Sequence, residues 1–360
     1  MKWVAWLIAA ILAGSATARA DILIGVAGPF SGQYANLGNQ LRAGVEAAIS
    51  AANASGGING ENLVAVPIDD ACDTRKAVDA ARQLVGRDVR LVVGHYCSGA
   101  SAAAAIVYKD AGILMMMPTA SRPALTDAAN WNVIRLTGRD DAAFALAANR
   151  IASATGAPKA AIVSASTPQY QSLVQTAAAT LPQAVQIAIK LGAFNSTETA
   201  QQLMDNGVEQ VIIALPSTES SALASSLLYA GFQGVIYGGE QFLSEDFMSG
   251  ASDVGFDMLA AFPQDPMTNP SAASVASQLS ANGAAAEGGT LPSYAAVQAF
   301  VAAARARTVN DGPAMASWLR AGNTVDTVIG RISFDAKGDL ARQPFTWYRW
   351  QAQAKRFLPE

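Results

Sequence analysis

The sequence is poor in charged residues, histidine and cysteine. Of its 360 residues, 14% are charged, one is a histidine (His95) and two are cysteines. A single histidine excludes multi-histidine metal sites, and a Ser-His-Asp triad would have to use that residue. The net charge of −4, without a basic stripe, lacks the electrostatic footprint of a nucleic-acid binder. Because 51% of the residues are hydrophobic, disorder is excluded and globular lobes are expected.

Signatures of the common enzyme classes are missing as well. The chain has no GxGxxG, Walker A, GxSxG, HExxH or CxxC motif. Asp69, Asp70 and Asp73 surround Cys72, but their spacing does not match a calcium loop, so turn or capping roles are expected. We therefore predict a protein that is not an enzyme and that holds no metal and no cofactor.

Residues 1–20 have the pattern of a secretory signal peptide. Lys2 precedes an apolar run over residues 3–13, and the small residues that follow end in the A-x-A cleavage signature Ala18-Arg19-Ala20. The alternative is a membrane anchor, although the run is short for a bilayer span. Export from the cytoplasm is predicted, with no stable membrane insertion after cleavage.

Export also decides how the two cysteines are interpreted. In an oxidising compartment, thiols pair, so Cys72 and Cys97 are predicted to form a disulfide. The alternative is a nucleophilic or metal-binding cysteine.

Apolar strand-like runs alternate with amphipathic helical patterns after residue 20. The strand-like runs are 22–27, 63–68, 91–94, 113–117, 160–164, 186–191, 210–215, 235–237, 258–262, 331–334 and 345–350. Buried runs separated by helices predict an α/β fold with parallel sheets covered on both faces. The strands are too many for one compact sheet, so two lobes are expected, with crossings near residues 137–141 and 263–270.

Polar residues follow several of these runs. Ligands of parallel sheets bind beyond the carboxyl ends of the strands, where helix N-termini present free N–H groups. Ser98 and Ser121 could meet an anion there, and Glu240 a cation. The alternatives are a helix cap, a loop hydroxyl and a solvated or capping carboxylate. His95, just past a strand, is interpreted as structural rather than catalytic.

Short motifs are spread over nearly the whole chain after residue 20. They include Gly28-Pro29-Phe30-Ser31-Gly32, Asp69-Asp70-Ala71-Cys72-Asp73, Gly94-His95-Tyr96-Cys97-Ser98 and Phe334-Asp335-Ala336-Lys337-Gly338-Asp339. Together they resemble the periplasmic Leu/Ile/Val-binding proteins of ABC transporters. The resemblance implies a type I periplasmic binding fold, in which two doubly wound, Rossmann-like lobes are joined by three hinge crossings. The implied limits are 21–139 plus 264–342 for the N-terminal lobe and 140–263 plus 343–360 for the C-terminal lobe.

The resemblance also implies a set of ligand-binding residues. The set is Ser98, Thr119, Ala120, Ser121, Tyr170 and Glu240. Ser98 would bind the ligand carboxylate, and Glu240, from the other lobe, its ammonium. Leu37 and Pro216-Ser217 stand where relatives place aromatic residues, which reshapes the side-chain pocket and leaves the identity of the ligand open.

The expected function is that of a monomeric extracytoplasmic receptor. It would bind a small, apolar or branched-chain amino acid such as leucine and deliver it to the permease subunits of an ABC transporter. Three alternatives remain open. The same fold could bind an amide, urea or an aromatic carboxylate, act as a ligand sensor for a separate signalling receptor, or be a secreted enzyme that uses carboxylates.

Overall fold

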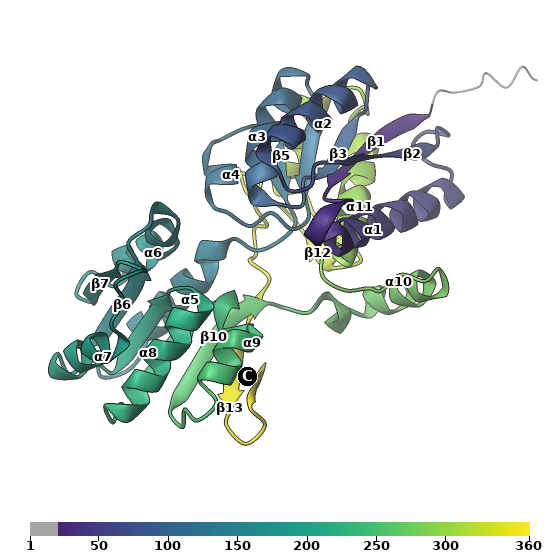
Figure 1. Cartoon of the computed structure of the whole chain (residues 1–360). Helices are drawn as coiled ribbons and strands as arrows, with labels where there is room; N and C mark the ends of the chain where they lie inside the picture. The colour runs from purple at the N-terminus through teal and green to yellow at the C-terminus, as the bar shows by residue number, and fades with distance from the viewer. Residues whose placement is uncertain (1–20) are drawn as a thin grey trace, which may run out of the picture.

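The computed structural model describes residues 21–360, so the predicted signal peptide lies outside the described residues. The chain forms two lobes, each built on one main β-sheet (Figure 1). Within residues 21–360, no helix is both long and apolar enough to cross a bilayer.

The sheet of the first lobe has five parallel strands in the order β2-β1-β3-β4-β5. The strands are β1 (Ile22–Gly28), β2 (Leu63–Asp69), β3 (Leu91–Gly94), β4 (Leu114–Met117) and β5 (Val133–Arg135). The helices of this lobe are η1 (Gly32–Tyr34), α1 (Ala35–Ala54), α2 (Thr74–Gly86), α3 (Ser98–Asp110), α4 (Ala124–Asp127), η3 (Pro266–Thr268), α10 (Pro270–Ala281), α11 (Thr290–Ala306) and α12 (Gly312–Arg320). A small antiparallel pair joins β11 (Val325–Thr327) to β12 (Gly330–Ile332).

Alternating side chains bury both faces of this sheet. Along β3, Leu91 and Val93 face the core formed with α1 and α11, whereas Val92 faces α2 and α3. A strand buried on both faces must be apolar throughout, which is why the strands are recognisable in the sequence as continuous hydrophobic runs.

The second lobe has a seven-stranded sheet in the order β14-β13-β10-β9-β8-β6-β7. The strands are β6 (Ala160–Ala165), β7 (Val185–Ile189), β8 (Gln210–Ala214), β9 (Val235–Gly238), β10 (Asp257–Pro263), β13 (Phe345–Gln351) and β14 (Arg356–Pro359). The helices are α5 (Asp140–Ala152), α6 (Pro168–Thr180), α7 (Ser196–Asp205), α8 (Ser217–Tyr229), η2 (Glu240–Leu243) and α9 (Glu245–Gly250). Strands β6 to β10 are parallel, and β13 and β14 extend the sheet in antiparallel fashion.

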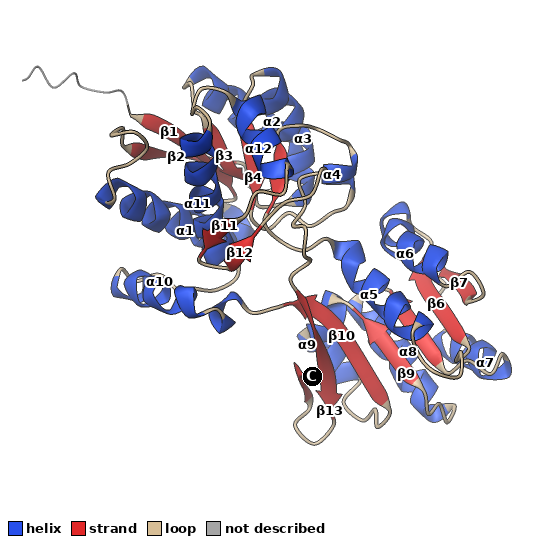
Figure 2. Ribbon diagram, turned by 180° about the vertical axis from the view of Figure 1, so that it is seen from behind, coloured by secondary structure: helices blue, strands red, loops and turns tan. Residues whose placement is uncertain are grey.

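Both lobes repeat one topology. The parallel strands of each follow the doubly wound order in which the first strand lies between the second and the third. The chain passes between the lobes three times, from β5 to α5, from β10 to η3, and after Leu340 into β13. Seen from behind, the lobes stand apart and these segments connect them (Figure 2). The predicted α/β fold of two doubly wound lobes is thus confirmed.

Some local predictions differ from the structure. The sequence pattern does not reveal β5, α7 or β14. The polar stretch 137–141 is predicted as a break, whereas α5 begins within it at Asp140. The strand predicted over 331–334 ends at Ile332, within the two-stranded sheet. Short elements such as the three-residue β5 do not extend over enough residues to show a period.

Candidate functional site

A cavity of about 1290 Å³ lies between the lobes. Its walls are the loops after β3 and β4 in the first lobe, the loops after β8 and β9 in the second, the start of α6, and the three crossing segments. These loops leave the carboxyl ends of parallel strands, where the fold class places its ligands. The volume exceeds the roughly 300–1,000 Å³ usual for small-molecule pockets, as expected of a cleft that is open to solvent.

A disulfide and a buried hydrogen-bond network fix the loop after β3. As predicted, Cys72 pairs with Cys97, with their Cα atoms 5.5 Å apart. Nδ1 of His95 lies 2.5 Å from Oδ2 of Asp70, and its Nε2 lies 3.0 Å from the hydroxyl of Tyr108. All three side chains are fully buried. His95 is therefore structural, as predicted, and holds the loop that leads to α3.

Ser98 is the first residue of α3. Its Oγ accepts hydrogen bonds from the backbone N–H of Ser121 at 3.3 Å and of Arg122 at 3.5 Å. The hydroxyl hydrogen has no acceptor within residues 21–360, so it is available to an anion. Ser98 itself does not line the cavity and lies behind the loop after β4.

The loop after β4 brings Thr119 and Ser121 to the cavity wall, and Ala120 behind it. The hydroxyl of Thr119 donates to the carbonyl oxygen of Tyr96 at 2.8 Å. The carbonyl oxygen of Ala120 accepts from Nη1 of the buried Arg135 at 2.9 Å. A buried guanidinium thus holds the loop from behind.

Glu240 reaches the cavity from the second lobe. It begins η2 directly after β9, in a turn where a side chain on Gly238 would collide with the ring of Phe242. Although the Glu240 side chain is exposed in the cleft, the surrounding walls remove enough water to raise the pKa of its carboxyl, and the charge of Asp140 raises it further. Burial and the charge of Glu240 likewise raise the pKa of Tyr96 across the cleft.

Asp140 is a cavity residue that the sequence analysis did not identify. It is the first residue of α5, and its N–H donates to the carbonyl oxygen of Ser121 at 3.1 Å. Burial raises the pKa of Asp140, and the nearby hydroxyl of Ser121 opposes that shift. The one available signal is its position at a predicted crossing between the lobes.

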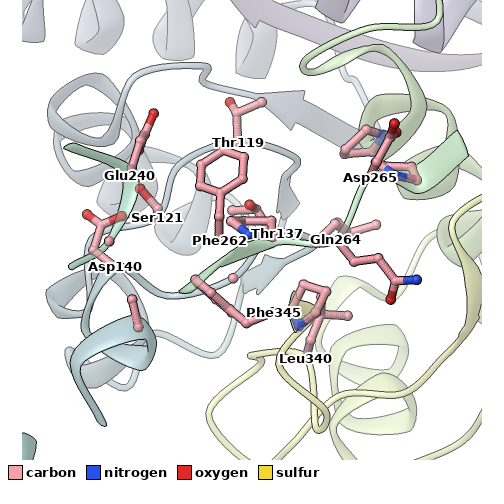
Figure 3. Close-up of a pocket in the computed structure, with 18 of the residues that line it drawn as sticks. Thr119, Ser121, Thr137, Asp140, Glu240, Phe262, Gln264, Asp265, Leu340 and Phe345 are labelled. Carbon is pink, nitrogen blue, oxygen red and sulfur yellow. The ribbon is translucent and has the colours of Figure 1, made fainter. Parts of the chain in front are cut away.

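Aromatic side chains supply much of the remaining wall. They are Tyr96, Phe144, Tyr170, Phe262, Phe345 and Tyr348. Tyr170, one of the predicted site residues, lines the cavity, whereas Leu37 does not. Phe262 and Phe345 come from two crossing segments, because β10 and β13 pair at that point. Figure 3 shows Glu240, Ser121 and Asp140 grouped at one end of the cavity, with Phe262 and Phe345 beyond them.

A family model described as periplasmic binding protein matches residues 21–355. The chain is 31% identical to Leu/Ile/Val-binding protein homolog 2 of Brucella abortus (strain 2308), over 95% of this chain and 94% of that protein. It is 30% identical to an amino acid binding protein of Pseudomonas aeruginosa, over 97% of this chain and 95% of that protein.

Solved structures share the fold at lower identity. An ABC transporter substrate-binding protein of Desulfitobacterium hafniense, in complex with Leu, matches with a TM-score of 0.73 and 20% identity, over 94% of this chain and all of that one (100%). A solute-binding protein of R. palustris in complex with 4-hydroxybenzoate matches with a TM-score of 0.70 and 18% identity, over 94% of this chain and 95% of that one.

Proposed function

The chain belongs to the periplasmic binding protein family, and from that membership we propose that it is the receptor of an ABC transporter for a small amino acid. The family is one of extracytoplasmic binding proteins rather than enzymes, in line with the missing catalytic motifs. The two relatives carry the names Leu/Ile/Val-binding protein homolog 2 and amino acid binding protein, which supports this class of cargo.

The opposite polarity of the two lobes at the cleft carries the proposal. On the first lobe, the hydroxyl hydrogen of Ser98 and the N-terminus of α3 offer donors to a carboxylate. On the second lobe, Glu240 offers a carboxylate to an ammonium. A zwitterion satisfies both the donors of the first lobe and the carboxylate of the second.

Hinge closure follows from this division of contacts. A ligand that touches both lobes gains its full set of interactions only when they meet, so it binds the closed form more tightly than the open one. We propose that a membrane permease recognises that closed form. Contacts of Thr119, Ser121 and Tyr170 with the ligand belong to the same proposal, and Ala120 supports them from behind.

A ligand screen tests the proposal. Purified residues 21–360 are heated with leucine, phenylalanine, urea or 4-hydroxybenzoate, and the melting temperature is recorded. Binding at 100 times Kd adds about 2.7 kcal/mol to stability, so a true ligand gives a clear upward shift. Small-angle scattering of the same samples should then show a more compact particle. A shift with 4-hydroxybenzoate and none with any amino acid would overturn amino acid cargo.

An aromatic carboxylate is the second candidate cargo. The aromatic side chains around the cavity, Phe262 and Phe345 among them, favour it, because they can pack against a ring. Glu240 disfavours it, since an anion without an ammonium would leave this carboxylate unpaired.

The cellular context completes the proposal. We propose that residues 1–20 are a cleaved signal peptide, that the mature chain is periplasmic and monomeric, and that it serves ABC permease subunits. The proposed lobe limits are 21–139 plus 264–342 and 140–263 plus 343–360. Membership of β1 to β5 in one sheet and of β6 to β10 with β13 and β14 in the other supports those limits.

A further inference from the structure

Arg139 lies in the first crossing between the lobes, immediately before α5. Its side chain is only 15% exposed. Nε and Nη2 of its guanidinium each lie 2.9 Å from one carboxylate oxygen of Asp141, which gives the forked geometry that arginine favours. Asp141 belongs to α5, and that helix packs Phe144 and Ala147 into the core of the second lobe. The carboxylate of Asp141 therefore moves with the second lobe.

The same guanidinium is also bound to the first lobe. Nη1 and Nη2 donate to the two carboxylate oxygens of Asp127 at 3.1 and 3.0 Å, and Nη1 donates to Oδ2 of Asp339 at 3.0 Å. Asp127 ends α4, and Asp339 is buried beside Arg135 of β5. Figure 1 shows α4 in the first lobe and α5 in the second. One guanidinium thus bridges two helices that belong to different lobes.

The surroundings of this bridge leave room for the lobes to move. A second cavity, of about 650 Å³, separates α4 from α6 next to Arg139. The backbone N–H of Arg139 donates to the side-chain oxygen of Gln343 at 3.0 Å, so the residue also touches the third crossing. A rotation of α5 relative to α4 changes the distance between the carboxylates of Asp141 and Asp127. Because the guanidinium is a rigid plane, it cannot keep both forked pairs during such a rotation.

We propose that Arg139 is a positioning residue that bridges α4 and α5 and holds the lobes in the open arrangement, so that closure has to release one of its carboxylate partners. The bridge is made while the cavity between the lobes is open to solvent, and it therefore stabilises that arrangement relative to a closed one. A ligand that binds the closed form has to offset this stabilisation, which lowers its apparent affinity. The inference goes beyond the proposed function, because the bridge acts on the ligand-free protein whatever the cargo is.

Small-angle scattering of the ligand-free protein tests the bridge. Asp141→Asn removes the charge that ties the guanidinium to α5, and we expect residues 21–360 of this variant to have a smaller radius of gyration than wild type. Asp127→Asn leaves Asp339 as an anchor on the first lobe, so its change should have the same direction and be smaller. Titration calorimetry should then show that Asp141→Asn binds leucine about fivefold more tightly than wild type, because its closed form is more populated.

A control variant separates lobe movement from a loss of stability. Arg150→Gln breaks a forked pair with Glu360 that lies within the second lobe, so it should lower the melting temperature and leave the radius of gyration unchanged. A radius for Asp141→Asn that equals or exceeds that of wild type overturns the inference, and so does a decrease that Arg150→Gln shares.

Two further outcomes have a defined meaning. If Asp141→Asn fails to fold, Asp127→Asn, at a more exposed side chain, decides by the same criterion. If wild type does not bind leucine, the proposed cargo is in question, whereas the scattering of the ligand-free variants still decides whether the bridge holds the lobes open.

Discussion

The carboxylate of Asp339 lies 2.7 Å from Nε of Arg135, and both side chains are almost fully buried. Arg135 ends β5, and Asp339 precedes the last crossing into β13. The guanidinium of Arg135 also donates to the carbonyl oxygens of Ala120 and Arg122, which flank Ser121. The ion pair therefore fixes the binding loop and joins it to the segment that enters the hinge.

Breaking this pair should destabilise the protein strongly. Asp339→Asn leaves the charge of Arg135 buried without a counter-charge, which costs about 3–5 kcal/mol of unfolding free energy. Urea denaturation followed by circular dichroism measures the loss. Asp326→Asn removes one side of the exposed Arg331–Asp326 pair and should change stability little. Similar midpoints for the two variants would contradict the structural role of Asp339.

Removing the charge of Glu240 should weaken amino acid binding. Glu240→Gln leaves the ligand ammonium with a neutral partner, and we expect a loss of about 2–4 kcal/mol in binding free energy. Titration calorimetry with leucine measures it. Glu245→Gln, in α9 and outside the cavity, is the matched control and should bind like wild type. Equal affinities of wild type and Glu240→Gln would refute the assigned contact.

The disulfide should contribute to stability more than to binding. Replacing Cys72 and Cys97 together by alanine opens the loop that the disulfide closes. The chain-entropy model predicts a loss of roughly 3 kcal/mol in unfolding free energy. The contacts of His95 with Asp70 and Tyr108 still hold the loop, so leucine affinity should change only a few-fold. Wild type unfolded in urea with a reductant should behave like the double variant. An unchanged midpoint in reductant would contradict this expectation.

Acid should reduce the contribution of Asp127 to the stability of the fold. Hydrogen bonds from Arg139, and also from Lys337, lower the pKa of Asp127 to about 2. The pKa of Asp127 is lower in the folded protein than its value near 3.9 in the unfolded chain, so the charged carboxylate stabilises the fold at pH values above 3.9. This stabilisation is lost as the pH falls towards 2. Because the side chain is 40% exposed, solvent screening reduces the effect to about 1 kcal/mol.

Comparison of wild type with Asp127→Asn isolates this effect. The difference in unfolding free energy should be constant from pH 7 to about pH 5 and should then shrink to a small fraction as the pH falls through about 2. Urea titrations across that range provide the measurement. A difference that stays the same at low pH would show that the carboxylate is not the source.

Long buried elements could be predicted from the sequence. The apolar run 22–27 corresponds to β1, and the helix expected near residues 98–110 corresponds to α3. Burial on both faces gives such strands an uninterrupted apolar sequence. In contrast, β5 has only three residues, and α7 buries only Thr199, Ala200 and Leu203, so its apolar face is too short to stand out.

The candidate site was partly predictable. Ser121 and Glu240 follow strands, and the rule that ligands bind at carboxyl ends of strands points to them directly. Asp140 lies in a polar stretch at a crossing, where nothing in the local pattern distinguishes a cavity residue from a turn residue. Phe262 and Phe345 are far apart in sequence, and the pairing of β10 with β13 brings them together.

The position of β13 in the sheet affects the order in which the two lobes can be completed during synthesis of the chain. β13 lies between β10 and β14, although it is made after every helix of the first lobe. A chain that emerges from the ribosome therefore reaches residue 330 with the β10 edge that pairs with β13 still open. Because elements of both lobes lie after residue 330, neither lobe has all of its segments until almost the whole chain has been made.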